Sequence, residues 1–182
     1  MAADSRNLRW PAVIVFLVVL LDQLTKLWAV SALTGQPSQP FLGRFFMFTL
    51  IYNEGGAMGT SFGSSTFYLI VSLVVTPILT YFIYTHREQP ILALPMSFIV
   101  GGAIGNIIDR IRFGQVVDFI DIDIPDINLL WIQIDRWWTF NIADASISCS
   151  LAFLIVYLTF FKHKHSAPLS TDTPQSRPVD TH

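Results

Sequence analysis

Aspartate and asparagine side chains at a repeated spacing are the residues of this sequence best suited to catalysis. Asn106 and Asp109 end one long apolar run, Asp118 follows them, and Asn141 and Asp144 open the last apolar run with the same Asn-x-x-Asp spacing. Charges at the edge of such a run are costly and usually carry function. Two aspartates that share one proton can activate a water molecule and protonate a leaving amine, provided that a low-dielectric site keeps one of them protonated. The pattern therefore indicates aspartic-protease chemistry.

The histidines offer no alternative catalytic base at these clusters. All four lie in a short turn or in the C-terminal tail, at His86, His163, His165 and His182. Their positions remove the usual base for a serine or cysteine nucleophile and the usual imidazole ligands for zinc. Lys26 could serve a serine-lysine dyad, but Asp22 lies one helical turn away and is the expected partner of its ammonium. We predict no metal site and no cofactor.

The composition indicates an integral membrane protein. Of the 182 residues, 52% are hydrophobic and 13% are charged, and the mean hydropathy is +0.52. This composition is more apolar than that of a soluble domain, and the length allows about four spans of roughly 20 residues. The formal net charge of -2 gives no sign of a nucleic-acid partner. The single cysteine, Cys149, cannot form an internal disulfide and is expected to be a packing residue.

Four apolar stretches are long enough to cross a membrane as helices, at residues 11–33, 67–85, 91–111 and 140–161. The first could instead be a secretory signal peptide, but Asp22 and Lys26 interrupt its apolar core and would share one helix face, so we interpret it as a span. In the third, Gly101, Gly102 and Gly105 provide a small-residue face on which another helix can pack closely. The predicted fold is a mainly α, four-helix membrane bundle.

The loops between the spans carry signals of β-structure. Residues 44–52 form an aromatic and β-branched run that predicts a strand, and the NEGGAMG sequence at 53–59 predicts a tight turn. The second loop alternates apolar and polar residues around Pro125, which predicts a β-hairpin on the membrane surface. Its aspartates are expected to be solvated, at Asp121, Asp123, Asp126 and Asp135.

Four spans would place both chain ends on one side of the membrane. Basic residues weakly favour the cytoplasm for that side, and the polar residues 162–182 predict a disordered tail there. A helix rises about 1.5 Å per residue, so Asp22 and Lys26 lie roughly 17 and 22 Å along the first span, and Asp109 about 27 Å along the third. Asp144 lies about 6 Å below the outer start of the fourth. These depths predict a polar chamber near the outer surface.

Five short motifs occur in order along the chain: DQLTK at 22–26, YNEGGAMG at 52–59, GGAIGNIIDR at 101–110, VVDF at 116–119 and FNIAD at 140–144. Together they resemble the successive motifs of bacterial lipoprotein signal peptidase, also called signal peptidase II. The sequence departs from that pattern at Met58, where the family usually has phenylalanine, and at Thr139, where proline is common. The loop at 121–138 also looks longer than usual.

The resemblance implies an aspartic endopeptidase of the bacterial inner membrane, with four transmembrane helices, an extracytoplasmic β-cradle and a small helical flap. Such an enzyme removes signal peptides from prolipoproteins, cutting before a cysteine that carries a diacylglyceryl group. Residues 1–161 would form a single membrane-embedded peptidase domain, with both termini in the cytoplasm and the active site toward the outer face. Its partners would be the prolipoprotein and membrane lipids, with no nucleic acid, and it would act as a monomer.

The resemblance also implies a role for each polar residue of the motifs. The catalytic pair would be Asp118 and Asp144. A second group would line and order the site, namely Asn53, Asn106, Asp109, Arg110 and Asn141. Asp22 and Lys26 would be structural. Since neighbours on a helix do not face each other, Arg110 could hold a lipid phosphate or a substrate carbonyl instead of Asp109.

Two other classes of function remain open from the residues alone. Embedded aspartate, asparagine and arginine side chains could mark the ion path of a small ion- or proton-coupled transporter. The same charges could also serve only to hold a structural membrane anchor together. A transporter would show flux without hydrolysis, whereas a purely structural role would let every motif tolerate alanine with no loss beyond stability.

Overall fold

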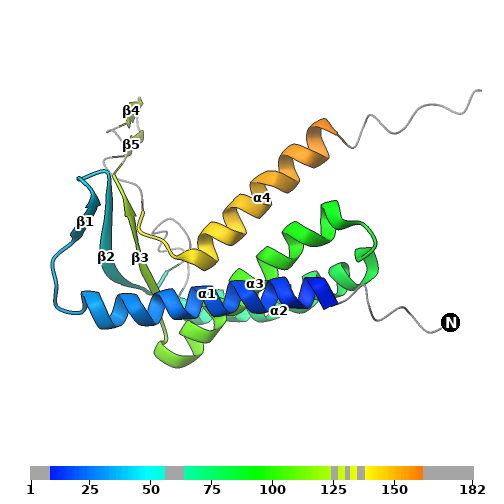
Figure 1. Ribbon diagram of the computed structural model, residues 1–182, viewed down its shortest axis with the longest axis horizontal. Helices are drawn as coiled ribbons and strands as arrows, with labels where there is room; N and C mark the ends of the chain where they lie inside the picture. Colours follow the sequence, from blue (N-terminus) through cyan, green and yellow to red (C-terminus); the bar gives the residue numbers. More distant parts are fainter. Residues whose placement is uncertain (1–8, 56–63, 124–126, 130–131, 135–137, 162–182) are drawn as a thin grey trace, which may run out of the picture.

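Four long helices and a small sheet make up the part of the chain that the computed structural model describes, which is residues 9–55, 64–123, 127–129, 132–134 and 138–161 (Figure 1). The elements in chain order are α1 (Arg9–Leu33), β1 (Gln39–Leu42), β2 (Phe46–Asn53), α2 (Ser65–His86), α3 (Pro90–Phe113), β3 (Val116–Ile122), β4 (Ile127–Leu129), β5 (Ile132–Ile134) and α4 (Ile142–Phe160). The predicted tail at 162–182, Met58 and Pro125 lie outside the described residues, as do Asp126 and Asp135.

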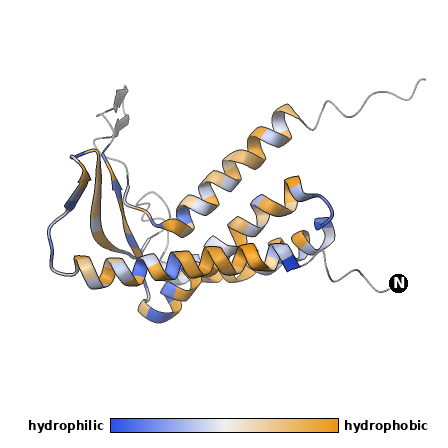
Figure 2. Ribbon diagram, in the orientation of Figure 1, coloured by the Kyte–Doolittle hydropathy of each residue, from blue (hydrophilic) through white to orange (hydrophobic). Residues whose placement is uncertain are grey.

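All four helices are long and apolar enough to cross a membrane, which confirms the predicted spans. Hydrophobic residues make up most of the length of the helices, while hydrophilic residues gather where the helices approach the sheet and at the α2–α3 turn (Figure 2). The fourth helix begins at Ile142, not at Phe140, because Phe140 forms a bridge with Ile120 and Asn141 caps the helix. The result is a multi-pass membrane protein of mainly helical structure.

Helix α3 is the centre of the bundle, because it packs against α1, α2 and α4. Its glycines permit the close approach. A Cβ atom added to Gly101 would lie 2.7 Å from Cβ of Val18 on α1, and one added to Gly102 would lie 2.5 Å from the carbonyl oxygen of Ala143 on α4. The predicted small-residue face is therefore confirmed, and it sets the spacing of the helices that carry the polar residues.

The sheet has the order β1-β2-β3, with both pairs antiparallel. The predicted strand at 44–52 is observed as β2. Strand β3 leaves α3 through Gly114, whose φ of 70° lies in the left-handed region that glycine adopts without strain. The register pairs Ile51 with Asp118 and Asn53 with Val116, so the end of β2 lies beside the start of β3.

The sheet is attached to the end of α1. Trp28 makes edge-on contacts with Phe48 and Phe119, at centroid distances of 5.0 and 6.0 Å, and Phe119 is buried in a cluster with Ala29 and Leu33. The predicted hairpin in the second loop is also present, as β4 and β5. Figure 1 shows the sheet at one end of the bundle, with the start of α1 and the end of α4 toward the other.

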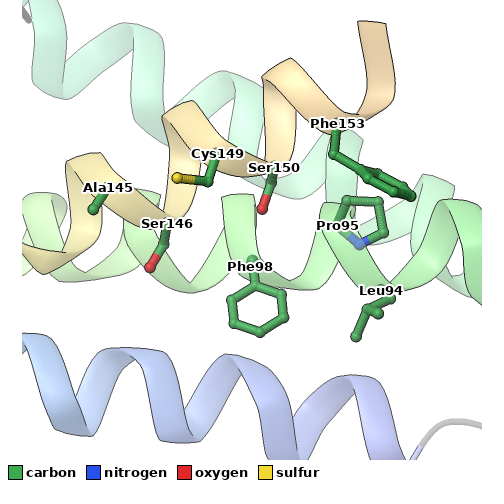
Figure 3. A pocket seen from close by; sticks show the side chains of 8 residues that line it. All are labelled: Leu94, Pro95, Phe98, Ala145, Ser146, Cys149, Ser150 and Phe153. Carbon is green, nitrogen blue, oxygen red and sulfur yellow. The ribbon is translucent and has the colours of Figure 1, made fainter. Parts of the chain in front are cut away.

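An apolar cavity of about 430 Å³ lies between α3 and α4 (Figure 3). Its lining comes from Leu94, Pro95, Phe98, Ala145, Ser146, Cys149, Ser150 and Phe153. None of the polar residues singled out in the sequence contributes to it. Cys149 is exposed and lines this cavity, so the prediction that it is a packing residue was wrong.

Candidate active site

Nine polar residues predicted from the sequence form one connected network where the helices meet the sheet. Helix α1 contributes Asp22 and Lys26, and the sheet contributes Asn53 from β2 and Asp118 from β3. The last turns of α3 and the first turn of α4 supply the other five, which are Asn106, Asp109, Arg110, Asn141 and Asp144. The hydrogen bonds and ion pairs described below join all of them.

Asp118 is held by two side-chain amides. Nδ2 of Asn141 donates to Oδ1 at 2.8 Å, and Nδ2 of Asn53 donates to Oδ2 at 2.9 Å. The side chain is buried, at 1% exposed. Burial and the neighbouring Asp144 carboxylate raise the pKa of Asp118 to about 7, against the opposing effects of the two amide hydrogen bonds and the charge of Lys26. Near neutral pH this group can therefore either hold or accept a proton.

Asp144 lies beside Asp118 and is partly exposed. Nδ2 of Asn106 donates to its Oδ1 at 2.8 Å. Asp144 also completes a capping box with Asn141, in which its backbone N–H donates to Oδ1 of Asn141 at 2.9 Å and its Oδ2 accepts from the Asn141 backbone N–H at 3.4 Å. The capping box fixes the side chain at the start of α4.

The amide nitrogens of the two Asn-x-x-Asp motifs donate to carboxylates outside their own motif. Asn106 of the first motif donates to Asp144 of the second, while the amide N–H of Asn141 reaches Asp118. The sequence placed each amide on one helix face with a carboxylate, but it did not show that these hydrogen bonds cross between elements. Asn141 precedes the helix as its N-cap, so the two motifs also differ in backbone conformation.

Lys26 forms ion pairs with two buried aspartates. Its Nζ lies 2.9 Å from Oδ2 of Asp22, as expected from their spacing, and 2.8 Å from Oδ2 of Asp109. Asp109 is therefore paired with Lys26 of α1. All three side chains are buried, so each charge depends on the others for compensation.

Arg110 points to other partners than Asp109. Its NH2 donates to the backbone carbonyl of Gly55 at 3.4 Å, and its guanidinium lies 5.7 Å from the ring centroid of Tyr68. Its NH1 donates to the backbone carbonyl of Asn106 at 3.5 Å, which joins Arg110 to the network. Its Nε is buried and has no hydrogen-bond partner among the described residues. A buried donor left unpaired is costly, so this nitrogen is suited to receive an oxygen of a bound molecule.

Gln23 belongs to the network although the sequence analysis gave it no role. Its Nε2 lies 3.1 Å from Oδ1 of Asp109, 3.2 Å from Oδ2 of Asp22 and 3.2 Å from the carbonyl oxygen of Gly105. A polar side chain beside Asp22 in an otherwise apolar run was the available signal.

Asp121 corrects a second expectation. It was predicted to be solvated, but it is only 4% exposed, and Oγ1 of Thr49 donates to its Oδ2 at 2.6 Å. The reason is the antiparallel pairing of β2 and β3, which places Asp121 opposite Met47 inside the sheet.

This arrangement can perform acid-base catalysis by carboxyl groups. Asp118 and Asp144 lie in a poorly solvated site, where like charges disfavour double ionisation and one proton can be shared. Among the residues that the structure describes, no three or more histidine, cysteine, aspartate or glutamate side chains are grouped so as to hold a metal ion. The two aspartates and their amide donors are the groups that the described site supplies for proton transfer.

The sequence is similar to proteins of one known family. The sequence model of the family described as signal peptidase (SPase) II matches residues 14–160. Lipoprotein signal peptidase of Halothermothrix orenii is 36% identical over 146 residues, which cover 80% of this chain and 92% of that protein. Lipoprotein signal peptidase of Cupriavidus necator is 35% identical over 159 residues, covering 85% of each.

Solved structures agree with the sequence relatives. A chain described as a bacterial membrane enzyme structure, determined by the in meso method at 2.3 Å resolution, superposes with a TM-score of 0.69 and 28% sequence identity. The superposition covers 87% of this chain and 93% of that one. A second structure described in the same way, at 1.9 Å resolution, gives a TM-score of 0.68 and 30% identity. By its family match, its relatives and its fold, this chain belongs to the signal peptidase II family of membrane peptidases.

Proposed function

We propose that this peptidase removes signal peptides from prolipoproteins and that Asp118 and Asp144 are its catalytic pair. The observation that supports the pair most directly is their meeting in one buried network, with each carboxylate held by an asparagine amide. The family match favours a peptidase over an ion- or proton-coupled transporter. It also gives the embedded charges a catalytic use that a structural anchor would lack.

The proposed reaction uses one ionised and one protonated aspartate. The ionised carboxylate accepts a proton from water while the water oxygen forms a bond with the scissile carbonyl carbon. The protonated carboxyl group donates its proton to the leaving nitrogen, and the C–N bond breaks. The products are a signal peptide with a new carboxylate and a lipoprotein with a free amine, and the pair again carries one proton.

The proposed substrate bond precedes a cysteine that carries a diacylglyceryl group, as the family resemblance implies. A lipid-linked substrate suits a site at the end of a helix bundle, because the lipid can stay in the bilayer while the peptide reaches the pair. We propose that Nε–H of Arg110, which has no partner among the described residues, donates a hydrogen bond to a carbonyl oxygen of the peptide or to a phosphate oxygen of a lipid.

The proposed setting is the bacterial inner membrane, with the termini in the cytoplasm and the pair toward the outer face. The position of the sheet and site at the opposite end of the bundle from the start of α1 and the end of α4 supports this orientation (Figure 1). The proposed catalytic unit is a monomer formed by residues 1–161, because the residues of the described network come from a single chain, between Asp22 and Asp144.

The test is cleavage of a diacylglyceryl-modified prolipoprotein by the purified protein in detergent, followed by gel shift. Asp118→Asn and Asp144→Asn keep the side-chain shape but remove the shared proton, so each is expected to lower kcat by at least about 1000-fold. Asp123→Asn is the matched control, because Asp123 follows β3 outside the network. It is expected to cleave at close to the wild-type rate.

Two further arms separate the rival readings. Chelator is added to the wild type, and the aspartate mechanism predicts unchanged cleavage. Prolipoprotein without the diacylglyceryl group is supplied in parallel, and it should remain uncut. Near-normal turnover by either dyad variant would refute the catalytic pair, and absence of cleavage by a folded wild type would refute the proposed function.

A further inference from the structure

The ammonium of Lys26 uses all of its hydrogen-bonding capacity inside the protein. Its three oxygen partners are Oδ2 of Asp22 at 2.9 Å, Oδ2 of Asp109 at 2.8 Å and Oδ1 of Asn106 at 2.9 Å. A lysine ammonium has three donors and no acceptor, so these contacts account for each of its N–H bonds. Lys26 is also 3% exposed. Its surroundings therefore fix its position more strictly than a surface ion pair would.

The contact with Asn106 determines which way that amide faces. Because an ammonium can only donate, the atom of Asn106 that faces it is the carbonyl oxygen, and the amide nitrogen is turned toward Oδ1 of Asp144 at 2.8 Å. Asn141 supports the same orientation by donating to Oδ1 of Asn106 at 3.2 Å. Rotation of the amide by half a turn would set donor against donor and oxygen against oxygen.

The two carboxylates that hold Lys26 also hold the backbone next to the catalytic pair. Oδ1 of Asp22 accepts from the backbone N–H of Ala143 at 3.0 Å, one residue before Asp144. Oδ2 of Asp109 accepts from the backbone N–H of Val117 at 3.1 Å, one residue before Asp118. The same buried ion group therefore contacts the chain directly before each member of the pair.

We propose that Lys26 is a positioning residue for the reaction, acting at the centre of a frame formed with Asp22 and Asp109. This inference rests on the proposed function, since it concerns the geometry of the same pair. Lys26 makes its hydrogen bond and ion pairs with Asn106, Asp22 and Asp109 and not with either member of the pair, so it acts through Asn106 and the two backbone contacts. It extends the structural role that the sequence implied for Lys26 to control of the catalytic geometry.

The first test is Lys26→Met, which keeps most of the length of the side chain but removes its charge and donors. Folding is measured first, by thermal unfolding, because the variant leaves two buried carboxylates without their cation. Turnover is then expressed per folded molecule. We expect kcat to fall about 100-fold while KM changes less than about threefold, because Lys26 does not touch the substrate. A wild-type kcat per folded molecule would overturn the proposal.

The pH profile gives a readout that a purely structural role would not move. The charged groups around Asp118 are Asp144 of α4, Arg110 of α3 and Lys26 of α1, together with Asp22 and Asp109, which hold Lys26. Loss of the positive charge makes ionisation of the pair harder, so the alkaline limit of activity in Lys26→Met should move to higher pH. An unshifted limit would contradict the proposed influence of Lys26 on the pair.

A second pair of variants keeps the proposal testable if Lys26→Met does not fold. Asp109→Asn retains an oxygen that can accept from Lys26 and from Val117, whereas Asp109→Leu retains none. Per folded molecule, Asp109→Leu should lose at least about tenfold more kcat than Asp109→Asn. Equal kcat values would overturn the frame. Wild-type cleavage together with an inactive Asp118→Asn would leave the proposed function standing in either case.

Discussion

At the scale of single residues, asparagine supplies the site with donors that add no charge. A lysine or arginine in contact with Asp118 would favour its ionised form strongly, and the pair could then not keep a proton near neutral pH. The amides of Asn53 and Asn141 instead orient the two oxygens of Asp118 while burial keeps its pKa near 7. Orientation and protonation are thus controlled by different features of the site.

The raised pKa of Asp118 predicts the pH dependence of cleavage. As the pH rises through about 7, Asp118 ionises and the pair loses the proton that the leaving nitrogen needs, so kcat should fall about tenfold for each further pH unit. The pKa of Asp118 in the folded protein lies above the ordinary aspartate value of 3.8, so the contribution of Asp118 to stability is complete below that value and is lost as the pH rises through about 7. Rates from about pH 5 to about pH 9 test the activity limb, and a flat profile would contradict it.

Asn141 has two functions that substitutions can separate. Its Oδ1 caps α4 and its Nδ2 donates to Asp118. Serine is also a good N-cap but is too short to supply the amide donor, whereas alanine provides neither. We expect Asn141→Ser and Asn141→Ala both to lower kcat by about 10- to 100-fold. Only Asn141→Ala should also lower the free energy of unfolding, by about 1 kcal/mol, because it alone loses the cap.

The measurements for Asn141 are turnover per folded molecule and denaturant unfolding in detergent. Full activity of Asn141→Ser would show that the amide donor is dispensable and that the residue matters only as a cap. Equal stability losses in the two variants would show that the cap itself is not the source of the stability difference.

At the scale of elements, the closeness of α3 to α1 and α4 is what brings the polar residues together. Gly105 packs directly against the carboxylate of Asp22, and Gly102 packs against the backbone of Ala143 beside Asp144. A larger residue at either position would separate the helices. The glycines are therefore part of the active-site geometry although they carry no functional group.

Gly102→Ala tests this packing. Its added Cβ would lie 2.5 Å from the carbonyl oxygen of Ala143, so α4 must move, and we expect a loss of about 1–3 kcal/mol in unfolding free energy together with reduced kcat. Gly35→Ala is the control, because it also adds a methyl group but meets no atom within 4 Å. Because φ of residue 35 is 72°, in the left-handed region, Gly35→Ala should lower the free energy of unfolding by about 1 kcal/mol and leave kcat unchanged. Wild-type kcat in Gly102→Ala would contradict the packing argument.

The sequence predicted the elements better than the contacts between them. Helices, β2 and the later hairpin followed from apolar length, alternation and turn residues, and the ion pair of Asp22 with Lys26 followed from their spacing on one helix. The ion pair between Lys26 and Asp109 could not be predicted from spacing, because it depends on how α1 and α3 are rotated against each other. The burial of Asp121 likewise depends on strand register, which a single strand does not specify.

At the scale of the whole molecule, the four helices hold the proposed catalytic pair at one end and both ends of the described chain toward the other (Figure 1). An even number of spans places those ends on the same side of the membrane. The α2–α3 turn belongs to that side too, whereas the segment between α1 and β1 belongs to the side of the sheet. The proposed orientation therefore assigns a compartment to each loop.

Cysteine labelling tests that assignment. In a Cys149→Ser background, Gln36→Cys places a thiol between α1 and β1, and Glu88→Cys places one in the α2–α3 turn; both positions are exposed. A membrane-impermeant maleimide added to intact spheroplasts should label Gln36→Cys alone, and Glu88→Cys should react only after permeabilisation, because one span, α2, lies between the two positions. The reverse pattern would place the catalytic pair on the cytoplasmic side and exclude substrates that are cut after export. Labelling of both positions in intact cells would contradict a four-span topology itself.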